Sequence, residues 1–464
     1  MNIKAKIKNS NFFSNSFYFT RSLKLRLNLC CKKLTSNNLH SFTYYDLYCT
    51  KVYGKEKHNS LAKKIHDAAL ESISAKAKIK IGFVVYSADM WSCSKLYSLF
   101  EADSRFEPFI IVCSMKNETK QAEINIYKKA LDFFTNGGFR TVAAADCKNT
   151  LSDCGNPDIL IYLTPYTSVL TPGCFNISDI PLDKLTVYIP YSIIVSGNES
   201  LLENPTINLA WKFFCESKTY LELMREKSTL GGYNTVYTGF PGIDVLIEGK
   251  NNKHIFKAEN GMKKIIYAPH FSVGNEGIGY STFAENHNFM LELANATKGS
   301  VSWVIKPHPR LKTECVKFGV FENEESFDEY ITAWDNLPNA KSVFGGSYND
   351  LFAESDAIIL DSASFLAEYQ FTGNPLLFLT NSRQKFNSFG KAVLDTTYKA
   401  DGCDFKAIER FVTDTVLKSD DPMKDKRKEF FDTQLNYVKH NGGLNASEKI
   451  YSIIKNEVYN GNSN

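Results

Sequence analysis

The sequence of 464 residues has no run of eighteen apolar residues, so no segment of it has the length and composition of a membrane-crossing helix. None of its eleven cysteines forms a Cys-x-x-Cys pair, and no secretory signal segment precedes the rest of the chain. Structural zinc and a disulfide framework are therefore not predicted, and we expect reduced thiols in a cytoplasmic protein. The turn after the first expected strand, residues 86–91, has no glycine fingerprint, which argues against a dinucleotide site there.

Basic charge is concentrated at the start of the chain. Of the 54 Lys or Arg and 51 Asp or Glu, residues 1–80 hold 16 and 4, so 38 and 47 remain for the rest. Within residues 1–50, basic side chains stand beside aromatic and aliphatic ones, a composition that suits an anionic membrane surface on the inner face of the cell membrane. A solvated tail, or helices packed on the main body, fits the same composition. Nucleic acid is not an expected partner, because the remaining chain is acidic and carries no recognition motif.

From residue 79 onward, short apolar runs alternate with helical segments, which is the pattern of a parallel α/β fold. We predict two Rossmann-like domains facing across a cleft, at residues 79–247 and 262–410, joined by a polar linker at 248–262. Residues 1–78 form a basic, helical or irregular extension in this interpretation, and residues 411–464 form C-terminal helices. The expected strands are 81–86, 109–113, 159–163, 186–189, 213–215 and 236–237 in the first domain, and 264–268, 301–305, 342–344, 357–360 and 375–379 in the second.

A polar turn follows the expected strand 357–360. Asp361, Ser362 and Ser364 stand where a helix should begin, and Gly373 stands where it should end. Backbone N–H groups and hydroxyls in such a turn point beyond the carboxyl end of a strand, where a phosphate group is stabilised. An ordinary helix cap explains the same residue types, so the turn alone does not decide between the two.

Two histidines stand at the ends of expected strands in the second domain. His270 follows residues 265–269, and His308 lies in Lys306-Pro307-His308-Pro309-Arg310. Both should face the sheet edge that carries the serine turn. A histidine there can accept a proton from a hydroxyl near neutral pH, and the neighbouring lysine and arginine can neutralise phosphate charge. A structural role is the alternative for each histidine.

Three further features accompany this edge. Gly274 to Gly279 reads as a mobile loop over the cleft. Ser347 lies in a second polar turn, residues 345–350, where it is a candidate phosphate ligand; the alternative is that Asn349 or Asp350 of this turn simply caps the helix that follows. Glu368 lies four residues after Ser364 on the same helix face, where its carboxylate can accept hydrogen bonds from a ribose or simply face solvent.

Together these residues resemble the CDP-glycerol glycerophosphotransferase family, which comprises teichoic-acid and capsule polymerases with the GT-B fold. The resemblance covers roughly residues 80–400, and it is carried by Tyr267-Ala-Pro-His270, Lys306-Pro-His-Pro309, the stretch 355–364, the stretch 368–375 and Gly239-Phe-Pro-Gly-Ile-Asp244. Two departures stand out. The teichoic-acid polymerases usually follow Tyr-Ala-Pro with Thr and a basic residue, and they carry a Trp-His-Gly motif where this chain has Tyr188-Ile-Pro-Tyr191.

The resemblance implies transfer of a polyol phosphate from a CDP-polyol donor to a hydroxyl of a growing polymer or lipid-linked primer, with release of CMP. By position, His270 and His308 are the candidates for general base and for phosphate stabilisation, and Ser362 and Ser364 would hold the diphosphate. Neither a resident cofactor nor an essential metal is expected. A GT-B glycosyltransferase that uses a nucleotide sugar, and a non-catalytic homologue that binds polymer or membrane, are the alternatives.

Overall fold

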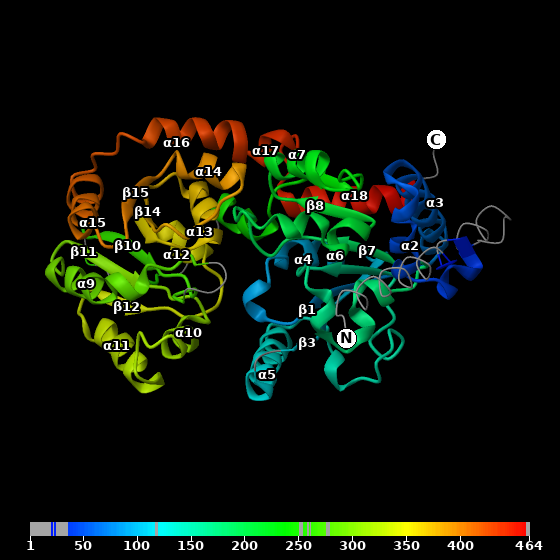
Figure 1. The fold of residues 1–464 in the computed structure, drawn as a ribbon, viewed down its shortest axis with the longest axis horizontal. Helices are drawn as coiled ribbons and strands as arrows, with labels where there is room; N and C mark the ends of the chain where they lie inside the picture. Colours follow the sequence, from blue (N-terminus) through cyan, green and yellow to red (C-terminus); the bar gives the residue numbers. More distant parts are fainter. Residues whose placement is uncertain are drawn as a thin grey trace, which may run out of the picture. The chain divides into compact units, whose positions relative to one another are not determined.

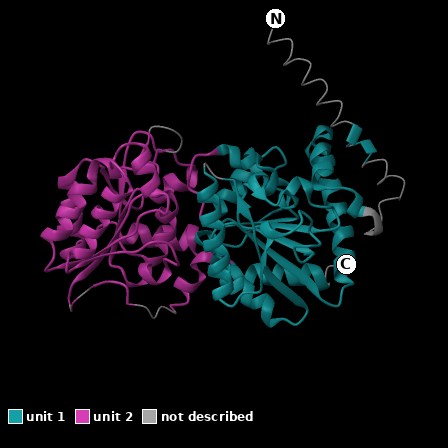
Figure 2. Cartoon of the chain, turned by 90° about the horizontal axis from the view of Figure 1, so that it is seen from below, with its two compact units in different colours: residues 1–191, 199–241, 441–464 teal, residues 192–198, 242–440 magenta. Residues whose placement is uncertain are grey.

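A computed structural model describes residues 20–21, 23–24, 36–116, 119–249, 254–257, 259, 261–274 and 279–460. The chain forms two compact units (Figure 2): unit 1 comprises residues 1–191, 199–241 and 441–464, and unit 2 comprises residues 192–198 and 242–440. The predicted C-terminal segment 411–464 is thus divided between the units at residue 440. Much of the basic extension, part of the linker 248–262 and residues 275–278 of the glycine loop lie outside the described residues.

Unit 1 is built on a parallel sheet of seven strands in the order β4-β2-β1-β5-β7-β8-β9 (Figure 1). The strong apolar runs found in the sequence form its central strands, and β4 is a short edge strand that the sequence did not predict. In addition to this sheet, β3 and β6 of unit 1 pair as a two-stranded antiparallel ribbon. The bounds are β1 Ile79–Val85, β2 Phe106–Val112, β3 Ser114–Met115, β4 Thr141–Ala143, β5 Ile159–Tyr162, β6 Leu170–Thr171, β7 Leu185–Tyr188, β8 Lys212–Cys215 and β9 Thr235–Tyr237.

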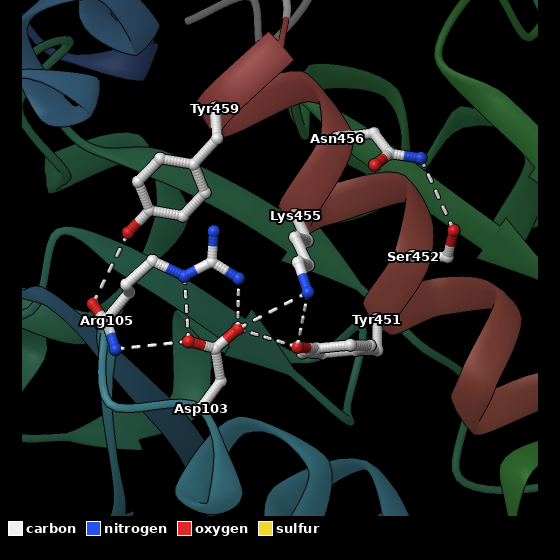
Figure 3. Close-up of polar contacts among 7 residues, drawn as sticks. All are labelled: Asp103, Arg105, Tyr451, Ser452, Lys455, Asn456 and Tyr459. Carbon is white, nitrogen blue, oxygen red and sulfur yellow. Dashed lines mark hydrogen bonds and ion pairs between the residues drawn. The ribbon is translucent and has the colours of Figure 1, made fainter.

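The helices of unit 1 come from both ends of the chain. They are α2 Tyr44–Cys49, α3 Lys55–Ser74, α4 Ser94–Ala102, α5 Lys120–Asn136, α6 Pro205–Leu209, α7 Lys218–Lys227 and α18 Ala446–Asn460. Helix α18 docks beside α4 and β2 through Asp103, whose carboxylate accepts hydrogen bonds from the Tyr451 hydroxyl (2.7 Å) and from Arg105 Nε (2.8 Å) (Figure 3). Tyr459 donates to the Arg105 carbonyl (3.4 Å) from the next turns of the helix. Residues near position 450 therefore complete a domain that begins before position 80.

Unit 2 is built on a parallel sheet of six strands in the order β12-β11-β10-β13-β14-β15 (Figure 1). The bounds are β10 Lys263–Ala268, β11 Val301–Ile305, β12 Ala340–Ser342, β13 Ala357–Leu360, β14 Leu376–Thr380 and β15 Tyr398–Asp401. Strand order reverses between β10 and β13, which is the arrangement of a doubly wound α/β sheet. The predicted fold class of two Rossmann-like sheets is confirmed. Strand β15 escaped prediction because its sequence, Tyr-Lys-Ala-Asp, is mostly polar at the sheet edge.

Helices cover the sheet of unit 2, with bounds α8 Asp244–Ile247, α9 Phe283–Ala296, α10 Leu311–Lys317, α11 Glu324–Asn336, α12 Asn349–Glu354, α13 Ala363–Glu368, α14 Ser388–Leu394, α15 Phe405–Arg410, α16 Lys424–Phe430 and α17 Tyr437–His440. Side chains alternate across the strands, so Tyr267, Trp303 and Ile305 point to one face, where they form a continuous buried core with α9, α10, α11 and α15. Within the described residues, no helix is long and apolar enough to cross a membrane.

Candidate functional site

The carboxyl ends of β10, β11 and β13 bring the predicted site residues to one edge of the unit 2 sheet. Tyr267 pairs with Ile305, and Ala268 pairs with Leu360. His270 and His308 each come three residues after one member of the first pair, and Ser362 comes two residues after Leu360. All three residues therefore lie at the same level beyond the carboxyl ends of their strands. This edge lies where strand order reverses, which is the position at which open α/β sheets bind ligands.

The two histidine rings lie side by side, with 5.5 Å between their centroids. His270 is 8% exposed and His308 is half-buried. Burial holds the pKa of His270 well below its usual value, and the charges of His308 and Arg310 lower it further. Burial, together with Arg310 and Lys306, lowers the pKa of His308 to about 4. Both imidazoles are therefore neutral at pH 7.

Hydrogen bonds fix the segment that carries His270. Its backbone N–H donates to Asp361 (2.6 Å), and its ring Nδ1 lies 2.8 Å from the Ser272 hydroxyl. Asp361 also accepts the backbone N–H of Thr282 (2.5 Å), so one carboxylate holds both ends of the segment 270–282. Burial raises the pKa of Asp361 to about 6, against the opposing effect of these bonds. We predicted that Asp361 binds a nucleotide phosphate, but its carboxylate is 1% exposed and occupied by the protein's own donors.

The basic residues of the site differ in their surroundings. Lys306 is 7% exposed, and its Nζ donates to the Gly345 carbonyl (2.9 Å), which ties β11 to the turn after β12. Arg310 is exposed, its guanidinium lies 4.5 Å from the centre of the Phe271 ring, and it pairs with Glu314 (2.7 Å). Because Glu314 neutralises part of that charge, Lys306 is the more deeply placed cation at this edge.

The serines occupy turns at the same edge. Ser362 takes the N-cap position of α13, yet within the described structure its side chain makes no cap hydrogen bond, and Ser362 and Ser364 are both partly exposed. The predicted alternative of an ordinary serine cap is therefore not realised. Ser347 is exposed and accepts the N–H of Asn349 (3.4 Å), so it belongs to the turn that precedes α12.

Glu368, like Asp361, is almost fully buried. It is 1% exposed, and its Oε1 accepts the N–H of Ile193 (3.3 Å), in a short segment of unit 2 supplied by residues 192–198. The same segment is fixed to the turn before α14, where Asn387 donates from its N–H to Val195 (3.0 Å) and from its side chain to Ile194 (2.9 Å). Burial raises the pKa of Glu368 to about 8. The predicted contact between Glu368 and a ribose is not supported by this burial.

Three residues near the edge were not predicted from the sequence. Ser272 contacts His270, as described above. Phe344, two residues after the end of β12, is 53% exposed and stands next to Gly345 in sequence. Arg383, after β14, donates to the carbonyls of Gly274 (2.6 Å) and Ser281 (3.1 Å) and so spans the glycine loop. Ser272 and Arg383 follow predicted strands, and this was the available signal for them; Phe344 lay inside the predicted strand 342–344, so nothing in the sequence marked it.

In the part of the chain that the structure describes, no group of three His, Cys, Asp or Glu residues is arranged to hold a metal ion. The site that the geometry does form contains neutral imidazoles, a buried lysine, an exposed arginine and partly exposed serines. Such a set of hydrogen-bond donors and cations can bind phosphate groups.

Comparisons with known proteins agree with this chemistry. A family model described as CDP-glycerol:poly(glycerophosphate) glycerophosphotransferase matches residues 191–456. No curated protein matches the chain. Similar solved structures include S. aureus MnaA with UDP (13% identity, 82% of this chain and 97% of that one, TM-score 0.52) and a putative UDP-N-acetylglucosamine 2-epimerase from Listeria monocytogenes (14%, 83% and 98%, 0.50). A variant of the wall teichoic acid polymerase TagF is similar over 97% of this chain and 99% of its own, at 12% identity and a TM-score of 0.50. At these identities the structural likeness concerns the fold.

Proposed function

The chain belongs to the CDP-glycerol:poly(glycerophosphate) glycerophosphotransferase family, and from this we propose that it transfers glycerol phosphate or ribitol phosphate from a CDP-polyol to a hydroxyl group. The acceptor is a cell-surface polymer or a lipid-linked precursor, and CMP is released. The observation that carries the proposal is the pair of imidazoles, 5.5 Å apart, beside Lys306 and the serine turn at the point where strand order reverses.

The reaction exchanges one phosphorus–oxygen bond for another. The acceptor oxygen forms a bond to the phosphorus that carries the polyol, and the bond from that phosphorus to the bridging oxygen of CMP breaks. The electron pair of the broken bond stays on CMP, and the hydroxyl proton is released. Positioning of the hydroxyl in line with the leaving oxygen and stabilisation of the phosphate charge are the contributions that the protein can make to this reaction.

Each part of the site has a role in this reaction. Lys306 and Arg310 balance the charge of the diphosphate, while Ser362, Ser364 and the more peripheral Ser347 donate hydrogen bonds to its oxygens. Phe344 offers the cytosine ring a surface for stacking, because its aromatic side chain is exposed and it directly precedes the glycine turn. These cations make an essential metal unnecessary, so activity should persist when EDTA is added; loss of activity that added Mg²⁺ restores would contradict this expectation.

A membrane-bound acceptor fits the basic start of the chain. On the described part of that region, Lys57, Lys63 and Lys64 of α3 are exposed, and Val52 just before it is 55% exposed. We infer that the protein is peripheral on the inner face of the cell membrane, held there by anionic lipids. Replacing Lys57, Lys63 and Lys64 with glutamine should weaken binding to anionic vesicles and leave transfer to a soluble acceptor intact, because these side chains are exposed; unchanged vesicle binding would contradict the inference.

Thermal stabilisation by nucleotides tests the proposed donor. CMP, CDP, CDP-glycerol, CDP-ribitol, UDP, GDP and ADP are compared, and a ligand at 100 times its dissociation constant adds about 2.7 kcal/mol to stability. Stabilisation by cytidine nucleotides alone, strongest with a CDP-polyol, supports the proposal. Stabilisation by UDP or GDP instead would favour a glycosyltransferase that uses a nucleotide sugar.

Turnover distinguishes an enzyme from a non-catalytic homologue. The His308→Ala variant should lose at least about a hundredfold in transfer rate, the scale expected when a catalytic side chain that donates or accepts a proton is removed. Pro309→Ala, next to it in sequence, is the matched control and should keep its rate within a few fold. Equal rates for His308→Ala and the unmodified protein would show that this edge is not the reaction centre.

A further inference from the structure

The ring nitrogens Nδ1 of His270 and His308 face the same kind of partner. The backbone N–H of Ser272 donates to Nδ1 of His270 (3.3 Å), and the backbone N–H of Arg310 donates to Nδ1 of His308 (3.1 Å). In each case the donor lies two residues after the histidine. An amide N–H cannot accept a hydrogen bond, so Nδ1 must be the nitrogen without a proton. A neutral imidazole has one proton, which then belongs to Nε2.

His270 has a second partner that His308 lacks. The hydroxyl oxygen of Ser272 lies 2.8 Å from Nδ1, and that oxygen also accepts the backbone N–H of Tyr280 (2.8 Å). With one of its lone pairs occupied by Tyr280, the hydroxyl can direct its own proton to Nδ1. Ser272 is 6% exposed, which excludes water as a competing partner for most of its surface. The position equivalent to Ser272 after His308 is Arg310, whose side chain cannot make this contact because it stacks on Phe271.

We propose that Ser272 is a positioning residue that fixes His270 with its proton on Nε2, so that His270 and His308 together present two neutral N–H donors to the donor's diphosphate and neither is the general base. The assignment rests on the proposed function, because a diphosphate is the ligand that these donors would meet. It also separates the two roles that the sequence left open for the pair.

The chemistry of the reaction is compatible with histidines that only donate. A histidine base is not required when another group can accept the proton of the acceptor hydroxyl. The proton of the acceptor hydroxyl then passes to the departing phosphate of CMP, whose second pKa is about 6. Neutral donors have a further advantage beside Lys306 and Arg310, since two imidazolium ions would add repulsion in a buried site. The lowered pKa values of both histidines are consistent with this state.

The protonation of the ring nitrogens is measured directly by NMR of the full-length protein with ¹⁵N-labelled histidine. The unmodified protein should show an unprotonated Nδ1 and a protonated Nε2 for His270 and for His308 at pH 7. In Ser272→Ala, the His270 signals should move toward a mixture of the two forms while those of His308 stay in place. Ser272→Thr, which keeps a hydroxyl, should restore them. A protonated Nδ1 on His270 in the unmodified protein overturns the proposal without any variant being needed.

Kinetics with CDP-glycerol test the role of the Nε2 proton. Glutamine places an amide N–H near the position of Nε2 but is not a base. If His270 is a donor, His270→Ala should lose about 100- to 1,000-fold in kcat, as for other lost oxyanion donors, and His270→Gln should recover at least tenfold of that loss. Equal loss in the two variants points to a base and overturns the proposal. Ser272→Ala should lower the rate by about 2- to 13-fold, the effect of one neutral hydrogen bond.

The two experiments separate this proposal from the proposed function. If CDP-glycerol neither binds nor reacts, the proposed function is wrong and the donor role toward a diphosphate is lost with it. If CDP-glycerol reacts and the ring state or the glutamine variant disagrees, only the present proposal is wrong.

Discussion

Replacing Asp361 with alanine should remove the hydrogen bonds that hold the segment carrying His270. The opposite end of β13, the strand that precedes Asp361, should not change. The carboxylate accepts the N–H groups of His270 (2.6 Å) and Thr282 (2.5 Å) and the hydroxyl of Thr282 (3.0 Å). All three donors are buried with it. In the alanine variant all three donors lose the acceptor that they share.

The expected size follows from these contacts. Each hydrogen bond to a charged group contributes about 1.5–3 kcal/mol, and two backbone amides lose one each. Burial raises the pKa of Asp361 to about 6, so desolvation offsets part of this gain for the ionised carboxylate at pH 7. We therefore expect the free energy that keeps the segment closed to fall by about 2–3 kcal/mol, which corresponds to amide exchange about 30- to 160-fold faster.

Hydrogen exchange followed by mass spectrometry at pH 7 measures this change in the peptides that cover residues 268–284. Asp356→Ala is the matched control, because Asp356 accepts the N–H of Lys264 (2.8 Å) at the opposite end of β10 and β13. Asp356→Ala should speed exchange at residue 264 and leave 268–284 unchanged. Exchange in Asp361→Ala within threefold of the unmodified protein, or an equal increase in both variants, would refute the role assigned to this carboxylate.

Three further outcomes are expected from buried or linked ionisable groups. Burial lowers the pKa of His58 to about 4 and of His66 to about 3, so below pH 6.5 the unfolded chain binds more protons than the folded chain. The free energy of unfolding of unit 1 should therefore fall by up to about 1.4 kcal/mol per pH unit for each histidine. Urea titrations at pH 7.5 and pH 5 would measure this loss. Tyr451→Phe removes the hydrogen bond to Asp103 at a partly exposed site and should lower the stability of unit 1 by about 1 kcal/mol, measured by thermal unfolding. An unchanged stability would mean that this hydrogen bond does not hold α18 in place. Burial raises the pKa of Glu368 from 4.5 to about 8, so between these two pH values the folded state binds more protons than the unfolded chain and stability falls as the pH rises. Glu368→Gln should flatten this dependence in urea titrations.

The sequence predicted the parts of the fold that depend on local pattern. Central strands such as Ile159–Tyr162 and Val301–Ile305 are continuous apolar runs, which a buried parallel strand requires on both faces. The edge strands β4 and β15 were not predicted, because an edge strand pairs with a neighbour on one side only and can therefore be short or polar.

The candidate site could be predicted only for residues whose positions follow from the pairing of the strands. His270, His308 and Ser362 follow neighbouring strands, so parallel pairing is enough to bring them to one edge. The roles of Asp361 and Glu368 depend on loops that return from distant sequence positions, at Thr282 and Ile193. No periodicity marks such loops, and a carboxylate beside a predicted phosphate turn looks the same in sequence whether it faces a ligand or the backbone.

The division of the chain affects the order in which the protein can fold during synthesis. Unit 2 comes mainly from residues 242–440, whereas unit 1 requires α18, which is translated after all of them. At about 5–20 residues per second, roughly 10–40 s pass before the ribosome reaches α18. During that time the rings of Phe100 and Phe106, which later contact Tyr451 at 5.4 and 6.3 Å, lack their cover.

The usual order of domain completion, from the N-terminus onward, is therefore reversed in this chain. A released chain that ends at residue 440 should therefore contain a protease-resistant unit 2, while Phe100 and Phe106 of unit 1 lack the ring contacts that Tyr451 provides.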